Sequence, residues 1–335
     1  MNNEQSSGPS CLSERERVER GRQKERRGRR IKRLKILFSI FLVCSASTVF
    51  AVENGAMITP TGTLDFAAGI LPPATDVGAV GVRFNFERAD QLRNNSGNRS
   101  VVTPDLGVNA VTPVFVKMTN VDVLGGKWGF GTVVPLLDQH LKLNIPTPVG
   151  SIAQSGSARG IGDIQLIPAL IQWNPSNGFF TNAVFMVQAP TGQYDKDRTI
   201  NPGVNHWTFQ PSCAFTYIAA FGLEASSRFQ FNFNTTNRAT DYKSGIEYEH
   251  DFAVGQHIGP WTIGVGGYFL LQLTDDSAPG LTNGNRARQL ALGPVISFVA
   301  PEWHLPMIYL HVYKEFASRN LAQGTQVALR VGWSF

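Results

Sequence analysis

The sequence has few of the features that would assign its class at once: cysteines, long apolar runs and amphipathic helices. It contains three cysteines in 335 residues, and Cys213 alone follows residue 51. This excludes an intramolecular disulfide and a cysteine metal cluster beyond that point. No run of about 18 apolar residues follows residue 51, so no membrane-spanning helix is expected there. Without helices or cross-links, the remaining chain is expected to be built from strands.

An excess of either charge is also missing once residues 1–35 are set aside, because basic and acidic residues are then nearly equal in number. The sequence has 30 Lys or Arg and 25 Asp or Glu, and residues 1–35 hold 12 of the former and 5 of the latter. The rest therefore carries 18 basic and 20 acidic residues, a net charge of about −2. The high isoelectric point comes from the leader and gives no support for nucleic-acid binding.

Residues 1–51 have the pattern of a secretory signal peptide with a long basic front. An apolar run, Ile36–Phe50, follows the basic residues, and Ala51 then offers a small residue for cleavage. The run is too short for a comfortable span, so a retained helical anchor is the weaker interpretation. Cys44 follows the bulky Val43, which argues against lipidation.

The last ten residues alternate strictly between two kinds of side chain. The segment Gln326–Phe335 places Val, Leu or an aromatic residue at every second position, with small or polar residues between them. Because successive strand residues point to opposite faces, one face is apolar and the other polar. A terminal strand that ends on an aromatic residue is typical of an outer-membrane β-barrel, with the terminus in the periplasm. We expect the barrel assembly machinery to engage this strand.

The same alternation recurs often enough to predict an all-β, transmembrane antiparallel barrel of about twelve strands with both termini in the periplasm. Connections alternate between long and short, as in outer-membrane barrels. We expect residues 79–335 to form the barrel. Residues 52–78, rich in Gly and Pro and with one possible strand at Thr61–Ile70 that would be surplus to the barrel, are expected to form a periplasmic arm or a plug in the lumen. Long polar connections are expected at Asp138–Arg159 and Ala317–Thr325. The strands are expected at Val80–Glu87, Val108–Lys117, Trp128–Leu137, Gly160–Trp173, Phe179–Gln188, Trp207–Tyr217, Leu223–Phe233, Lys243–Ala253, Trp261–Leu273, Arg288–Val299, Met307–Phe316 and Gln326–Phe335.

Prolines inside several of these strands conflict with a fully paired wall. A proline removes one ladder hydrogen bond, so β-bulges are expected around it. The positions are Pro113, Pro135, Pro168, Pro211 and Pro294.

Aromatic residues gather at the expected strand ends, where indole rings suit the membrane interface. All but one fall at the periplasmic end, and the exception is Trp207. The interface candidates are Trp128, Trp173, Trp207, Trp261, Trp303, Trp333 and Phe335. Their direct partners would be outer-membrane lipids.

Charged residues and one histidine fall on the face expected to line the lumen. They could filter solutes by charge and size, or they could form salt bridges along the wall, and one residue could do both. Barrel closure would bring Arg83 beside Arg330. The candidates are Arg83, Glu87, Asp163, Glu224, Arg228, Glu247, Glu249, Asp251, His311, Glu315 and Arg330.

The sequence gives little support for an enzyme. No histidine has a serine one or two positions away, although a pair across two strands stays possible. Gly160-Ile161-Gly162 falls far short of a dinucleotide fingerprint, and no helix follows it. We therefore expect no catalytic residue, no metal and no cofactor, and Cys213 is expected to be a small lipid-facing residue.

Several short motifs resemble one known family. They are Gly160-Ile161-Gly162-Asp163, Pro190-Thr191-Gly192, Tyr313-Lys314-Glu315-Phe316 before Gln323-Gly324, and the Phe-terminated last strand. Together they resemble outer-membrane proteins labelled as meta-pathway phenol degradation proteins. The resemblance implies a barrel in the bacterial outer membrane that aids uptake of aromatic or other hydrophobic compounds, and it transfers no binding residues.

The function expected is passive passage of small hydrophobic or aromatic solutes. A twelve-stranded barrel is wider than the solid eight-stranded ones and narrower than porins. The alternatives are a structural or adhesive barrel without an open pore and, with less support, an outer-membrane lipid hydrolase.

Overall fold

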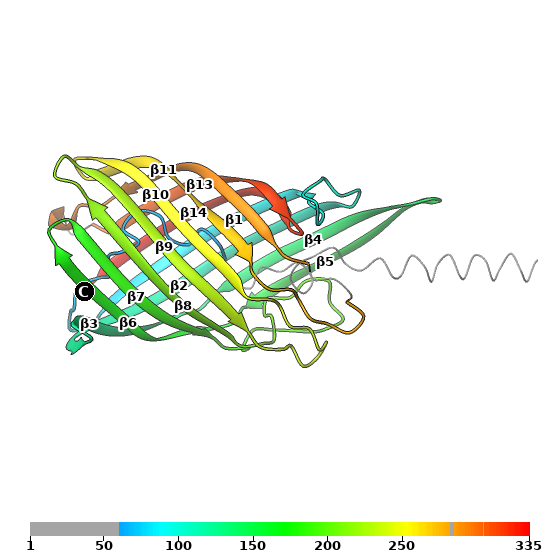
Figure 1. Ribbon diagram of the computed structural model, residues 1–335, viewed down its shortest axis with the longest axis horizontal. Helices are drawn as coiled ribbons and strands as arrows, with labels where there is room; N and C mark the ends of the chain where they lie inside the picture. The colour runs from blue at the N-terminus through cyan, green and yellow to red at the C-terminus, as the bar shows by residue number, and fades with distance from the viewer. Residues whose placement is uncertain (1–59, 282–284, 304) are drawn as a thin grey trace, which may run out of the picture. The chain divides into compact units, whose positions relative to one another are not determined.

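An antiparallel sheet closes on itself through hydrogen bonds between its first strand and its last (Figure 1). The computed structural model describes residues 60–281, 285–303 and 305–335, and the leader at residues 1–51 lies outside them. The strands are β1 (Ala79–Leu92), β2 (Thr103–Val123), β3 (Gly126–Val133), β4 (Leu136–Thr147), β5 (Gly150–Ile161), β6 (Gln165–Ser176), β7 (Phe179–Gln188), β8 (Thr208–Ile218), β9 (Leu223–Asn234), β10 (Glu247–Ile258), β11 (Trp261–Gln272), β12 (Arg288–Phe298), β13 (Met307–Arg319) and β14 (Ala322–Ser334).

The ring has twelve wall positions because two of them hold interrupted strands. β2 is 21 residues long and pairs with β4 along its first half and with β3 along its second. β3 and β4 therefore form one wall position, and β5 and β6 form the next. The predicted twelve-stranded, closed antiparallel barrel is confirmed.

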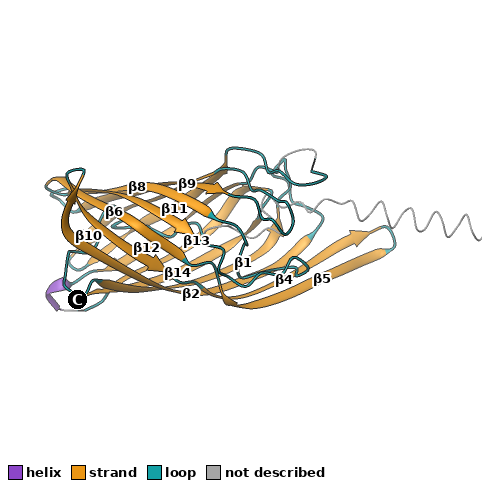
Figure 2. Ribbon diagram, turned by 90° about the horizontal axis from the view of Figure 1, so that it is seen from below, coloured by secondary structure: helices purple, strands orange, loops and turns teal. Residues whose placement is uncertain are grey.

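The breaks in these two wall positions lie side by side. β3 ends before Val134-Pro135, and β5 ends before Gly162. The N–H of Gly162 donates to the carbonyl oxygen of Pro135 at 2.8 Å, so the two breaks are joined. β4 and β5 continue as a long hairpin that reaches past the other strands (Figure 2).

Two connections expected to be long are instead strand. Asp138–Arg159 forms most of the β4–β5 hairpin, and Ala317–Thr325 contains only a two-residue turn, Asn320-Leu321. Both predictions took polar residues as a sign of loops. Polar residues also occur on strands that face the barrel interior. They occur as well on the exposed strand β5, in the hairpin that reaches past the other strands.

The prolines affect the wall unevenly. Pro113 lies where β2 changes partners, Pro135 lies in the break between β3 and β4, and Pro168 lies within a register shift between β6 and β7. The pairings on either side of Pro211 and Pro294 keep one register, so the bulges expected there are wrong. A break in the strand pairing can accommodate a proline just as a β-bulge can.

The four longest loops lie together at one end of the barrel, which also holds the two-residue turns after β4 and β13. The other end, with connections of eight residues or fewer, is called the short-turn end. β1 begins and β14 ends at the short-turn end, where Phe335 N–H donates to the carbonyl oxygen of Gly78 at 3.0 Å. Long loops follow β1, β7, β9 and β11 at the other end. Within the described part, no helix has both the length and the apolar character needed to cross a membrane.

Candidate functional site

The barrel interior has two unlike halves. Along β2, β3, β4, β6 and β7 the inward side chains are mostly apolar, and these strands form what we call the apolar wall. Its members face a cavity of about 960 Å³. They are Leu106, Val108, Ala110, Val114, Val116, Val133, Leu137, Leu141, Ile167, Leu170, Val184 and Met186.

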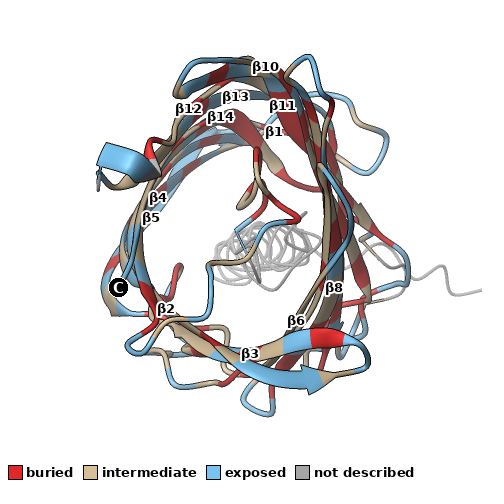
Figure 3. Cartoon of the chain, turned by 90° about the vertical axis from the view of Figure 1, so that its left-hand side faces the viewer, coloured by how far each residue is buried: buried red, intermediate tan, exposed pale blue. Residues whose placement is uncertain are grey.

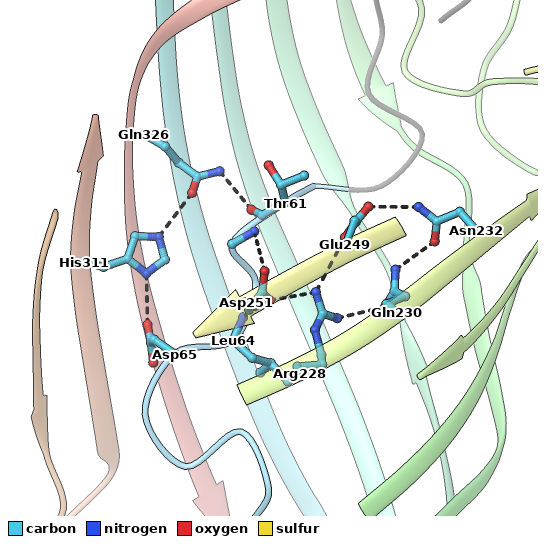
Figure 4. A network of polar contacts seen from close by, with 11 residues as sticks. Thr61, Leu64, Asp65, Arg228, Gln230, Asn232, Glu249, Asp251, His311 and Gln326 are labelled. Carbon is cyan, nitrogen blue, oxygen red and sulfur yellow. Dashed lines mark hydrogen bonds and ion pairs between the residues drawn. The ribbon is translucent and has the colours of Figure 1, made fainter. Parts of the chain in front are cut away.

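Along β8 to β14 the inward side chains are mostly polar and buried, and we call this half the polar wall. Arg228 lies at its centre, with its guanidinium 2.7 Å from the Asp251 carboxylate and 3.7 Å from that of Glu249. Arg228 also donates to Gln230, and the chain of bonds continues through Asn232 to Glu247 and Glu249. Most charged candidates on this wall are thus engaged in a hydrogen-bonded network (Figure 4).

Residues 61–71 run inside the barrel along the polar wall, and we call this segment the arm. The view along the barrel shows this chain within the ring of strands (Figure 3). Asp251 accepts the N–H groups of Gly62 and Leu64 at 3.2 and 3.1 Å, and Glu224 accepts that of Ala67 at 2.7 Å. Further along, the arm bonds Thr216 on β8, Asn182 on β7 and Gln172 on β6. The arm therefore steps from one strand to the next around the interior.

A buried carboxylate holds the middle of the arm. Asp65 pairs with Nδ1 of His311 at 2.9 Å and with Arg330 at 2.5 Å. Burial alone would raise the pKa of Asp65, but Arg330 and His311 outweigh it and hold this pKa below the ordinary value of 3.8. Arg330 also stacks on the Tyr309 ring at 4.1 Å. His311 is thus a partner of the arm rather than an isolated packed residue.

The cavity lies between the arm and the apolar wall. Leu64, Ala67, Ala68, Ile70 and Leu71 line it from the arm. The opposite lining is the apolar wall, so most of the enclosed surface is hydrocarbon. A space of this size and character can hold a small apolar molecule.

The charged candidates take up different positions around this cavity. Arg83, Glu87, Asp163, Arg228 and Arg330 line it. Glu315 accepts the Tyr268 hydroxyl at 2.7 Å and the Gly324 N–H at 2.6 Å. Glu224 lies 2.8 Å from the ring of His257. Their role in selecting solutes stays a prediction.

Asp163 fastens the loop between β7 and β8. Its carboxylate oxygens accept the N–H groups of Gly192 and Val204, each at 2.8 Å, from the two ends of this loop. Ile200, near the loop's centre, packs against Leu141 and Leu143 of β4. The loop consequently folds inward and covers the extension of the apolar wall. Two of the short family-like motifs, at residues 160–163 and 190–192, meet at this point.

The aromatic candidates lie at the barrel ends. Trp128, Trp173, Trp261, Trp303, Trp333 and Phe335 are at the short-turn end, and Trp207 precedes β8 at the long-loop end. Several are well exposed, including Trp303 and Phe335. This arrangement is compatible with contact with lipid headgroups, which stays a prediction.

One serine–histidine pair spans two strands, a case the sequence left open. Ser227 Oγ lies 3.0 Å from His250 Nε2, on the outer surface of β9 and β10. His250 stacks on Phe229 with ring centroids 4.5 Å apart. No described residue bonds the other ring nitrogen of His250, so the third group of a hydrolase triad is missing from the described part. Cys213 is exposed on the outer surface of β8. Among described residues there is no group of three metal-ligating side chains.

The sequence alone did not identify Asp65 or the network of glutamines and asparagines on the polar wall. Asp65 belongs to Thr61–Ile70, for which a possible strand was predicted; the structure has no strand there, and strand pairing would not have given its partners. The amides were visible as alternation along β8 and β9, but their bonding depends on the three-dimensional register of neighbouring strands.

Comparisons with known proteins agree with this architecture. The model of a family described as "Putative MetA-pathway of phenol degradation" matches residues 89–331. An outer membrane channel from Pseudomonas putida F1 superposes with a TM-score of 0.66 at 14% identity, covering 83% of this chain and 100% of that one. A likeness at this identity shows the fold, which is that of bacterial outer-membrane barrels.

Weaker likenesses include other outer-membrane barrels. The β domain of the Bordetella autotransporter BrkA gives a TM-score of 0.47 at 12% identity, covering 78% of this chain and 100% of that one. A Pseudomonas aeruginosa FadL homologue gives 0.40 at 8% identity, covering 78% and 91%. Neither is close enough to support an argument about function. No curated protein matches the chain.

Proposed function

This chain belongs to the phenol degradation family whose model spans most of its barrel, and we propose that it is an outer-membrane channel for passive uptake of small hydrophobic or aromatic solutes. Its bacterial outer-membrane location follows from the fold and the family. The observation that carries the proposal is the cavity of about 960 Å³ with its apolar wall. A porin for hydrophilic solutes would have a wet interior on all sides.

The mechanism is partition followed by diffusion. An apolar solute that enters from the long-loop end exchanges water for the hydrocarbon of the apolar wall. Each Å² of apolar surface removed from water contributes roughly 25 cal/mol, so a small aromatic ring gains enough to enter without specific bonds. Passage also requires release, which the lack of strong polar contacts along this wall favours.

The arm belongs to the same proposal as a plug that narrows the lumen. It covers the polar wall and reaches the apolar wall through hydrogen bonds with Asn182 of β7 and Gln172 of β6. It would therefore exclude hydrophilic solutes from the half that could bind them. Residues 60–78 would then help to select solutes inside the lumen and would not form part of the barrel wall.

A matched pair of substitutions on β2 tests the proposal. Ala110→Trp would fill the cavity from the inward face, whereas Val111→Trp adds the same ring on the outer face of the next residue. Influx of phenol into proteoliposomes should fall severalfold in the first variant and stay unchanged in the second. Equal influx in wild-type proteoliposomes and in protein-free liposomes would contradict a channel.

The alternative of a structural or adhesive barrel makes a different prediction for the same protein. A barrel without a path would show no solute-dependent influx and no conductance in planar bilayers, and its deletion would leave growth on aromatic compounds unchanged.

A further inference from the structure

Two buried polar residues on the inward face of β1 each carry a polar atom without a hydrogen-bond partner among the described residues. Arg83 is 8% exposed and Asn85 is 3% exposed. Among the described residues, no group forms a hydrogen bond with the Arg83 Nε or the Asn85 Oδ1, and both atoms are buried. Both residues line the cavity. Buried polar groups are rarely left unpaired in native proteins, so a pair of them at one place requires a reason.

The surroundings of Arg83 make its unpaired state more costly. In the β1–β14 register it lies directly opposite Arg330, and two like charges at opposed positions destabilise a sheet. Arg330 is neutralised by Asp65, and Arg228 is neutralised by Asp251. Asp65 and Asp251 are already occupied by these arginines and by other donors. Among the three described arginines of this cluster, Arg83 is therefore the one without a described carboxylate at ion-pair distance, although Asp65 and Asp251 attract its charge from farther away.

Arg83 also lies on the border between the two halves of the interior. On one side β14 begins the polar wall, and on the other β2 begins the apolar wall. Thr112 is its opposed residue on β2, with Ala110 and Val114 next along the same face. A molecule that bonded Arg83 could thus lay an apolar body on β2 while its polar group reached β1.

We propose that Arg83 and Asn85 form an anion-binding subsite, and that the solute is an amphiphile with an aromatic or aliphatic body and a carboxylate group. A guanidinium binds a carboxylate through two parallel hydrogen bonds, and such bonds are stronger than neutral ones. The Asn85 side chain lies two residues along the same face, and its Nδ2 can donate a further hydrogen bond to the carboxylate. Its unpaired Oδ1 is an acceptor and can bond only a donor group of the solute. This inference rests on the proposed channel function and specifies its substrate class.

Binding of two compounds of equal shape tests the subsite. The probes are 4-phenylbutyrate and its neutral amide, titrated calorimetrically into the purified barrel in a non-ionic detergent. The wild-type protein should bind the carboxylate at least about tenfold more tightly, as a hydrogen-bonded charge predicts. Arg83→Gln should remove this preference and leave affinity for the amide within about twofold. Arg83→Lys should keep part of the preference.

Arg88→Gln is the matched control because Arg88 lies on the outer, exposed face of the same strand. It removes the same charge and should change neither affinity. Folding of each variant is checked by the heat shift on gels, and Arg83→Gln should unfold no earlier than wild type because it removes an unpaired charge.

The outcomes separate the two proposals. Equal affinity for both probes in the wild type, or a preference that survives in Arg83→Gln, would overturn the anion subsite, and solvation of Arg83 by water would then explain its state. If the amide binds and crosses the barrel while the carboxylate shows no preference, the channel stands without the subsite. If neither probe binds or crosses, both proposals are wrong.

Discussion

The carboxylate of Asp65 lies 2.9 Å from Nδ1 of His311, although 246 positions separate these residues in the sequence. This contact, with the ion pair to Arg330, joins the arm to the two strands next to the barrel's closing seam. The arm is held by buried charge rather than by apolar packing alone.

Asp65→Asn should therefore loosen the arm. A buried ion pair that loses one partner costs about 3–5 kcal/mol, because the remaining charge stays buried. Hydrogen exchange of the backbone amides at residues 62–69 should show a matching drop in protection, and conductance should rise. Asp76→Asn changes an exposed carboxylate of the same N-terminal segment and should leave both measurements unaltered. Unchanged protection in Asp65→Asn would mean that the neutral bonds alone hold the arm.

The pH dependence of the arm follows from the lowered pKa of Asp65. A carboxylate whose folded pKa lies below its unfolded value stabilises the folded state fully above that unfolded value, here 3.8. The contribution is lost as the pH falls through the lower, folded pKa. Protection factors at residues 62–69 should therefore hold steady from pH 7 to pH 4 and fall in stronger acid. In Asp65→Asn this acid-dependent change should disappear. Loss of protection between pH 7 and pH 5 would show that another group controls docking.

Asp163→Asn should release the loop between β7 and β8. The carboxylate accepts N–H groups from both ends of this loop, and each charge-assisted bond contributes about 1.5–3 kcal/mol. Exchange at Gly192 and Val204 should speed up by at least tenfold. Asp197→Asn is the control, since its side chain is 78% exposed in the same loop. If both variants exchange alike, Asp163 does not fasten the loop.

Gly192→Ala tests how closely the loop packs on the wall. A Cβ at residue 192 would lie 2.8 Å from backbone carbon atoms of both Gly162 and Gly203. Backbone cannot move aside as a flexible side chain can, so overpacking of about 1–3 kcal/mol is expected. The temperature at which the heat shift on gels is lost should fall. Gly332→Ala should have little effect because its nearest contact is the end of Met307 at 3.6 Å.

Alternating side chains were enough to predict the barrel, its strand number and its closing strand. Residues such as Val327, Leu329 and Val331 all point to the same face of their strand. This two-residue alternation can be recognised without knowing how the strand pairs with its neighbours. The opposition of Arg83 and Arg330 could also be predicted, because closure of an even-numbered barrel places its first and last strands together.

Two features could not be predicted for a physical reason. The β4–β5 hairpin has polar residues where a loop was expected, and only its pairing with β2 shows that it is strand. The possible strand at Thr61–Ile70 is wrong, because the backbone donors of the arm bond side chains instead of a neighbouring strand. The periodicity of a short stretch of sequence reveals only its local structure. Both of these features depend on contacts between segments far apart in the sequence, so they could not be predicted from it.

Because the apolar wall and the polar wall face each other, the interior differs from one side to the other as well as from one end to the other. A passenger with unlike ends would keep one flank turned to hydrocarbon throughout its transit, so tumbling would be restricted and mirror-image molecules would fit differently. Such a passage could tell apart two solutes of equal size and polarity by the order in which their groups are arranged.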